Sequence, residues 1–184
     1  MGIVAHDHAA SGGIGLGEYR IQPEHPLPGL SSGPNIAYHA TSVDQPGKAF
    51  YALVCERASF PRLDIMPIVR TVGSAALLTP LVWQVIDWPP NGRRNFAIVF
   101  EMPAGARFVA SPGATAAPLS EDVVMRDYLA PIVSALTALS MAGVVHGAVN
   151  PANIIVGATR QQAVLGECVS APPFAHMPAA FLPI

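Results

Sequence analysis

The sequence lacks several features that would assign a function class directly. It has only two cysteines, Cys55 and Cys168, which is too few for a disulfide framework, so we expect a reducing cytoplasm. Charged residues make up 12% of the 184 residues and the net charge is −2, which gives no basic surface for nucleic acid. No apolar run reaches the roughly 18 residues of a membrane span, and residues 1–18 lack the pattern of a secretory signal.

Apolar residues make up 51% of the chain, with 19 prolines and 16 glycines, so we predict one domain with a sizeable core and many turns. Two N-terminal patterns lack the context of a binding site. His6 and His8 flank Asp7 in a stretch of Gly, Ala and Ser, which is typical of a tail rather than a metal site. Residues 13–17 are rich in glycine, yet they neither follow a predicted strand nor open a helix. We therefore predict a flexible leader over residues 1–18.

Residues 19–100 contain short apolar runs separated by turn residues, a pattern typical of antiparallel strands. Strands are predicted at residues 19–21, 35–43, 49–56, 81–88 and 96–100, with a short helix at residues 64–72. Pro23 and Pro26 should end the first strand because proline cannot donate to the hydrogen-bond ladder.

A long helix is predicted over residues 120–142. Ser120 can cap its N-terminus and Gly143 ends it. Pro131 lies inside the helix and should kink it or remove a hydrogen bond. Strands at residues 153–156 and 163–165 should follow. One apolar stripe at helical spacing is expected to be buried, namely Met125, Leu129, Ile132, Val133, Leu136 and Leu139.

The loop between this helix and the next strand has an informative residue order. Gly143 and two valines lead to His146, and a polar loop then contains Pro151 and Asn153. This order resembles the catalytic loop of the protein kinases, which reads H-R-D-x-x-x-x-N and is followed one strand later by D-F-G. His146, Pro151 and Asn153 match the family.

The residues that perform kinase chemistry do not match. The resemblance places Ala148 at the catalytic aspartate, Gly147 at the arginine and Asn150 at the catalytic-loop lysine. The metal-binding aspartate of D-F-G corresponds to Gly166. The chain therefore resembles a degenerate kinase, a pseudokinase.

Three polar residues remain at this predicted centre. His146 is structural in the family and is expected to be structural here. Asn153 has lost its carboxylate partner, and a lone amide cannot hold a divalent cation, so we expect it to hydrogen-bond within the loop. Glu167 is the only carboxylate near the metal position, and a turn or solvent-facing role is predicted for it rather than that of a displaced ligand.

The resemblance also implies a degenerate nucleotide cleft. If Ala52 is the alanine of the family's V-A-I-K strand, the phosphate-binding lysine falls on Val54, and a shift of one residue moves it to Cys55. At the hinge, Pro103 lacks the N–H that would bind adenine. A hinge shifted by one residue would give Met102 or Ala104 the donor role. The cleft as predicted comprises Ala52, Val54, Cys55, Glu101, Met102, Pro103 and Asn153.

The predicted fold is α+β and similar to bacterial serine/threonine protein kinases. An antiparallel β small lobe spans residues 19–100, a hinge and linker residues 101–118, and a truncated, mainly helical large lobe residues 119–184. We expect an inactive module, without cofactor or metal, that binds a protein partner or regulates a neighbouring domain. Two alternatives remain: a weakly active, atypical serine/threonine kinase that uses ATP and Mg²⁺, and an unrelated α+β domain.

Two further expectations concern packing. The truncated large lobe should expose apolar side chains of the long helix, and such patches mark interfaces or missing elements. Cys55 and Cys168 should face each other across the cleft as reduced, partly buried thiols.

Overall fold

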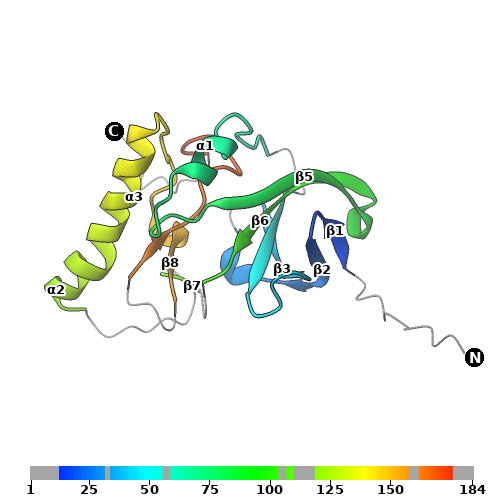
Figure 1. Ribbon diagram of the computed structural model, residues 1–184, viewed down its shortest axis with the longest axis horizontal. Coiled ribbons are helices and arrows are strands. Elements are labelled where there is room, and N and C mark those ends of the chain that lie inside the picture. The colour runs from blue at the N-terminus through cyan, green and yellow to red at the C-terminus, as the bar shows by residue number, and fades with distance from the viewer. Residues whose placement is uncertain are drawn as a thin grey trace, which may run out of the picture.

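The structure is a computed structural model that describes residues 13–31, 34–55, 59–103, 107–109, 119–157 and 162–175. A curled antiparallel sheet forms one part of the molecule, and a long helix with a small second sheet forms the other (Figure 1). The predicted linker at 110–118 and the chain after residue 175 lie outside the described residues.

The large sheet confirms the predicted antiparallel small lobe. Its strand order is β1-β2-β3-β4-β6-β5, and all neighbours are antiparallel. The strands are β1 (Ile14–Leu16), β2 (Tyr19–Pro26), β3 (Ile36–Ser42), β4 (Phe50–Cys55), β5 (Pro80–Trp88) and β6 (Arg93–Glu101). The short helix α1 (Met66–Thr71) follows β4, and single 3₁₀ turns lie at Pro28–Leu30 (η1), Pro89–Asn91 (η2) and Pro151–Asn153 (η4).

The first strand, β1, corrects the predicted leader. From Ile14 onward the chain belongs to the sheet, because β1 pairs with β2 and Leu16 is buried. Gly17, at φ +60°, supplies the left-handed turn that brings β2 back onto β1. The sheet curls until its edge strands β1 and β5 touch, so β1 helps to enclose a core that contains Tyr19, Phe50 and Trp88.

The prolines of β2 do not end the strand as predicted. Its pairing with β3 becomes irregular between Ile21 and Pro26, where the register shifts. β1 pairs with β2 only as far as Ile21, so Pro23 and Pro26 lie beyond that pairing. Prolines are tolerated on edge segments and at bulges, where no ladder donor is needed.

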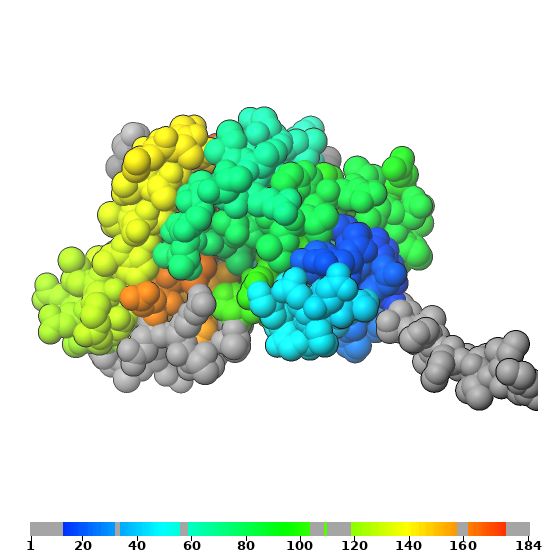
Figure 2. Space-filling view, viewed as in Figure 1, coloured from blue at the N-terminus to red at the C-terminus, as the bar shows by residue number. Residues whose placement is uncertain are grey.

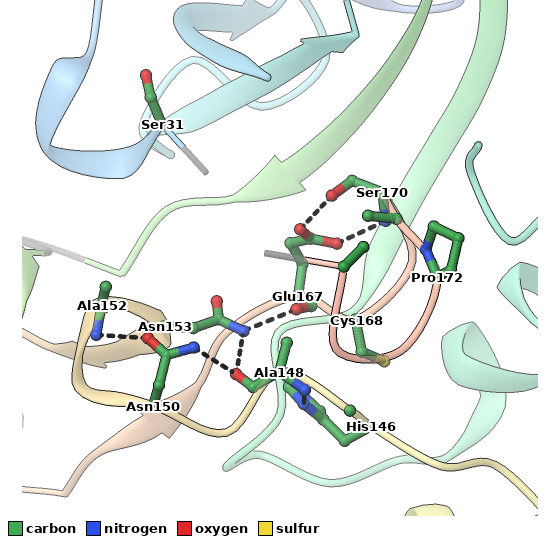
Figure 3. A pocket seen from close by; sticks show the side chains of 13 residues that line it. Ser31, His146, Ala148, Asn150, Ala152, Asn153, Glu167, Cys168, Ser170 and Pro172 are labelled. Atoms are coloured by element: carbon green, nitrogen blue, oxygen red, sulfur yellow. Dashed lines mark hydrogen bonds between the residues drawn. The ribbon is translucent and has the colours of Figure 1, made fainter. Parts of the chain in front are cut away.

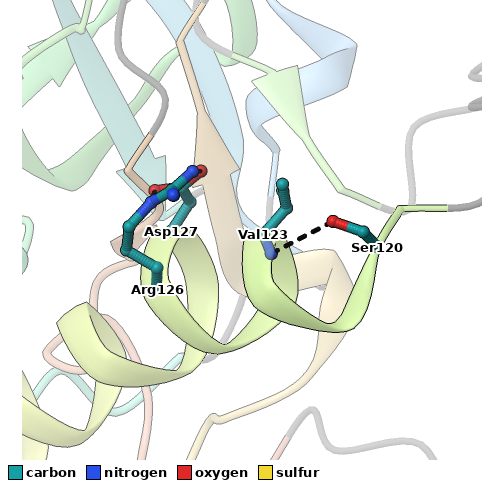
Figure 4. Close-up of polar contacts among 4 residues, drawn as sticks. All are labelled: Ser120, Val123, Arg126 and Asp127. Atoms are coloured by element: carbon teal, nitrogen blue, oxygen red, sulfur yellow. Dashed lines mark hydrogen bonds and ion pairs between the residues drawn. The ribbon is translucent and has the colours of Figure 1, made fainter.

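The long helix is built from α2 (Glu121–Val123), a π-helical turn η3 (Val124–Leu129) and α3 (Ala130–Met141). The Val123 N–H donates to the Ser120 hydroxyl at 3.4 Å, so the predicted cap is present (Figure 4). Pro131 removes the hydrogen bond that would reach the Asp127 carbonyl four residues earlier. The Ala163 N–H donates to that carbonyl instead, at 2.6 Å, and ties the helix to the strand that follows.

The buried face of the helix differs from the predicted stripe. Ile132 and Leu139 are buried, but Met125, Leu129 and Val133 are 53%, 44% and 57% exposed. The face against the core instead follows positions four residues apart, namely Asp127, Pro131, Ala135 and Leu139. Pro131 and Ala135 have short side chains, which lets the helix lie close to β9 (Val164–Leu165), the strand that it contacts.

By length and composition, residues 121–141 could cross a membrane, although the sequence suggested no run of that length. This is weak evidence, because a core helix of a globular protein meets the same criterion. Ile132, Ala135 and Leu139 belong to the same core cluster as α1 and β4 residues.

A small second sheet completes the described part of the large lobe. Strands β7 (Arg107–Phe108), β8 (Ile154–Val156) and β9 (Val164–Leu165) pair antiparallel in that order. β8 and β9 confirm the two strands predicted there. β7 was not predicted and lies within the region assigned to the linker.

Candidate functional site

His146 connects the loop after the helix to the segment after β9. The ring is buried; its Nε2 donates to the Gly166 carbonyl at 3.0 Å and its Nδ1 accepts from the Ala148 N–H at 3.2 Å. These two roles require a neutral ring with its proton on Nε2. Burial lowers the pKa of His146 to about 4, with a smaller contribution from the Arg62 cation, so the ring is neutral near pH 7. Its contacts are those of a structural histidine.

Asn150 shapes the loop rather than facing a substrate. Its Oδ1 accepts from the Ala152 N–H at 2.9 Å and caps the 3₁₀ turn η4. Its Nδ2 donates to the Ala148 carbonyl at 3.3 Å. Ala148, which stands at the position of the family's catalytic base, therefore contributes a carbonyl acceptor and no side-chain chemistry.

Asn153 is buried and uses its amide as a brace. Its Nδ2 donates to the carbonyls of Ala148 and Glu167, both at 2.9 Å (Figure 3). A Cβ atom at Gly166 would collide with Asn153 Oδ1 and lie 2.7 Å from its backbone carbonyl oxygen. An aspartate at residue 166 cannot fit without displacing Asn153, so the two metal-ligand positions of the family exclude each other here.

Glu167 is buried, which corrects the possibility that it faces solvent. One carboxylate oxygen accepts from the backbone N–H groups of Val169 and Ser170, both at 2.8 Å, and the other accepts from the Ser170 hydroxyl. The carboxylate thus caps its own turn, the second role that the sequence suggested. Among the described residues, no group of three or more His, Cys, Asp or Glu side chains is placed to hold a metal ion.

The two cysteines are free and buried, near the same carboxylate. Burial raises the pKa of both Cys55 and Cys168 to about 12, and the Glu167 charge adds to the shift. Burial and the same charge raise the pKa of the Tyr51 hydroxyl well above its usual value. The site therefore contains protonated thiols and a neutral phenol, none of which is activated as a nucleophile.

The faces of β4 correct the predicted cleft residues. Ala52 and Val54 pack in the closed core of the curled sheet, together with Trp88. Tyr51 and Leu53 point to the opposite face, toward α1 and the long helix. Because side chains alternate along a strand, Cys55 lies on that face too. The structure thus favours the shifted register, in which Cys55 takes the lysine position and Leu53 that of the family's alanine.

The space behind the hinge is filled by aromatic side chains. Tyr51 and Phe100 stack with ring centroids 5.3 Å apart and are almost fully buried. At the hinge itself, the Met102 N–H donates to the Ala49 carbonyl at 2.8 Å, so a shifted hinge cannot use it for adenine. Ala104, the other donor that a shifted hinge would use, lies outside the described residues. Pro103 has no N–H. Glu101 is half-exposed and pairs with Lys48 at 2.9 Å.

Gly147 lies against the end of the described chain. It has φ +70°, and a Cβ atom there would collide with Pro173. The Phe174 N–H donates to the Gly147 carbonyl at 2.7 Å. The segment that covers the loop therefore requires glycine where the family has arginine.

Arg62 joins the segment before α1 to this site. Its Nη1 donates to the carbonyls of Val145 and Cys168 at 2.8 and 3.1 Å, and its backbone N–H donates to the Val169 carbonyl at 2.8 Å. Sequence reasoning missed this residue. The sequence around it, with Pro61 before it and Asp64 two residues after it, does not identify its partners.

A small cavity remains between these elements. It has a volume of about 100 Å³, with Ser31 above it and His146, Asn153, Glu167 and Pro172 around it (Figure 3). Sites for cofactors and drug-sized ligands usually have about 300–1,000 Å³. The described residues do not fit ATP with Mg²⁺ at this cavity: its volume is too small, Gly166 and Cys55 stand where the family has its metal carboxylate and phosphate lysine, and neither Met102 nor Pro103 offers a free N–H at the hinge.

Comparison with known proteins places this fold. No protein-family model and no curated protein matches the sequence. The Drosophila melanogaster PAN3 pseudokinase matches with a TM-score of 0.62 and 15% identity, over 84% of this chain and 43% of that chain. The Mycobacterium tuberculosis PknI kinase domain, as a double mutant, matches with a TM-score of 0.65 and 16% identity, over 89% of this chain and 63% of that chain. Neurospora crassa PAN3, in its complex with PAN2, matches with a TM-score of 0.64 and 15% identity, over 87% and 41%.

These similarities establish a kinase-like α+β fold. At 15–16% identity, they are evidence for the fold and not for a function. The chain spans between 41% and 63% of the length of these three structures. Both kinases and pseudokinases share the fold, so the function of this chain depends on its own site.

Proposed function

We propose that this chain is a kinase-like module that does not transfer phosphate and that acts by binding a protein partner or regulating a neighbouring domain. One observation carries the proposal: Asn153 and Gly166 pack so closely that the metal-binding aspartate of the kinase D-F-G motif has no room at residue 166. The hydrogen bonds of Asn153 to Ala148 and Glu167 support a brace at this position rather than a metal site.

The size of the catalytic loss supports the same proposal. Phosphoryl transfer depends mainly on positioning and on electrostatic stabilisation by metal ions and lysine. A general base contributes about 10²–10⁴ in rate. With Ala148 at the base, Gly166 at the metal ligand and Cys55 at the lysine, several such factors are lost together. Ordinary kinase turnover and a bound nucleotide are not expected.

The proposed mode of action is supported by similarity and by composition. PAN3, which shares the fold, has been solved as a pseudokinase in complex with PAN2. The free, buried thiols are compatible with the cytoplasmic location that we propose. No cofactor is part of this proposal.

Thermal unfolding with and without millimolar ATP and Mg²⁺ tests the proposal. A ligand at 100 times its Kd stabilises a protein by about 2.7 kcal/mol, which gives a clear rise in midpoint for a domain of this size. We expect no rise. A Mg²⁺-dependent rise, together with γ-phosphate incorporation that is lost in Asn153→Ala, would instead establish the weakly active kinase.

A further inference from the structure

The outer face of the long helix is unusual for a surface in contact with water. Residues 128–157 contain no Asp, Glu, Lys or Arg. Leu129 and Val133 are 44% and 57% exposed, and Met141 and Val145 are 85% and 60% exposed. Figure 2 shows the helix, in yellow-green and yellow, at the outer edge of the molecule. A helix without charges is normally buried on most sides.

A groove runs beside these exposed side chains. Its volume is about 850 Å³, and it lies between the helix and the segment after α1. The helix wall is formed by Ala130, Ser134 and Ala138, and the opposite wall includes Gly73, Ala75 and Ala76. Ala138 lies eight positions after Ala130, so this wall is about 12 Å long, or roughly two helical turns.

The groove and the exposed side chains together match the packing surface of a helix. Large side chains at Leu129 and Val133 project next to the small-residue wall at Ala130 and Ser134. Helices pack by placing the ridges of one into the grooves of the other. A second helix can fill the groove with its own large side chains and receive Leu129 and Val133 between its turns.

We propose that this face binds a helix of a partner protein whose contact side is uncharged and carries large aliphatic side chains. The proposal rests on the proposed function and names the surface through which that function is exerted. Two turns or more of the partner would lie along residues 129–138.

Charge distribution favours this occupant. A charged partner side chain would lose water against residues 128–145 and meet no opposite charge there. The cation at the groove's end, Arg126, already holds Asp127 through two hydrogen bonds at 2.9 and 3.0 Å (Figure 4). The exposed residues Glu121 and Asp122 lie beyond that end and can pair with basic residues at one end of the partner helix. A bilayer surface fits less well, because adsorbed helices carry Lys and Arg on their polar face.

A site-specific photo-crosslinker tests the proposal in cells that express the full chain. It replaces Ser134 in the groove or, as the control, Val85 on β5, which is 42% exposed and lies on another element. The crosslinked partner segment is then made as a synthetic peptide, and its affinity is measured by fluorescence anisotropy. We expect a helical segment with an uncharged stripe, crosslinked at Ser134 and not at Val85.

Matched variants decide the result. Ser134→Arg should weaken the peptide's affinity by about tenfold or more, whereas Val85→Arg should leave it unchanged; Val133→Glu serves if Ser134→Arg does not fold. A crosslink to a second copy of this chain, to lipid or to an extended segment would overturn the proposal, as would equal effects of both variants or no adduct. If ATP stabilises the chain but the peptide still depends on Ser134, the proposed function fails and this inference stands.

Discussion

The close packing of Gly166 against Asn153 makes Gly166→Ala an informative perturbation. The new Cβ atom would collide with Asn153 Oδ1 and lie 2.7 Å from both its Cγ and its carbonyl oxygen. The Gly166 N–H donates to that same carbonyl at 2.8 Å, so the backbone cannot easily move aside. The Asn153 side chain must therefore rotate away from the new Cβ atom, while the close contact with the Asn153 carbonyl oxygen remains.

The cost follows from the bonds that Asn153 loses. Its Nδ2 donates to the carbonyls of Ala148 and Glu167. Each net hydrogen bond contributes about 0.5–1.5 kcal/mol, and a buried group left without a partner costs about 1–3 kcal/mol. Ala148 keeps a second donor from Asn150, so the unpaired group is the Glu167 carbonyl. Gly166→Ala should destabilise the chain by about 2–4 kcal/mol.

Urea unfolding measures this loss. With a slope of about 1–3 kcal/mol per molar urea, the midpoint should fall by about 1–2 M. Gly47→Ala is the control, because a Cβ atom at Gly47 meets nothing within 4 Å. In a double-mutant cycle with Asn153→Ala, the double variant should lose less stability than the sum of the two single variants, by about 1 kcal/mol or more. If the stability losses of the two single variants simply add in the double variant, the reasoning is refuted. A loss below about 0.5 kcal/mol for Gly166→Ala, the level of an ordinary surface substitution, would refute it as well.

Three further predictions follow from the site. His146 has a folded-state pKa of about 4, below its unfolded value near 6.5, so it contributes stability that is present above pH 6.5 and lost as the pH falls toward 4. Between pH 7.5 and 4.5, the unfolding free energy of the wild type should therefore fall by about 2.5 kcal/mol more than that of His146→Asn. Arg62→Ala should cost about 1–2 kcal/mol and speed amide exchange at residues 145–148 and 167–170. Cys55 and Cys168 should resist a thiol reagent at pH 8 in the folded chain and react rapidly in denaturant, because the thiolate is the reactive form.

Each of these predictions has a matched test. His25 is exposed, so His25→Ala should retain the pH dependence of the wild type. Arg70→Ala removes an exposed cation from α1 and should leave exchange near Val145 unchanged. A parallel loss of pH dependence in both histidine variants, equal exchange in Arg62→Ala and wild type, or fast labelling of the folded thiols would each contradict the corresponding argument.

Local signals in the sequence determined much of this protein. Turn residues between short apolar runs predicted the antiparallel sheet, and Ser120 and Gly143 predicted both ends of the long helix. The order of His146, Pro151 and Asn153 predicted the kinase-like loop. These features depend on neighbouring residues in the chain, such as caps, turns and missing N–H groups, so they can be recognised from sequence.

Tertiary structure alone decided the remaining features. The glycine-rich residues 13–17 have weak strand propensity, and Ile14–Leu16 form a strand because Leu16 enters the core of the curled sheet. The face of β4 that carries Cys55 depends on which side of the sheet α1 covers, and a shift of one residue reverses it. Likewise, helical spacing shows which residues of a helix share an apolar face, but it does not show which other segment packs against that face. Which of Ile132 and Val133 is buried depends on how closely β9 approaches the helix, a contact between segments about thirty residues apart that local pattern cannot report.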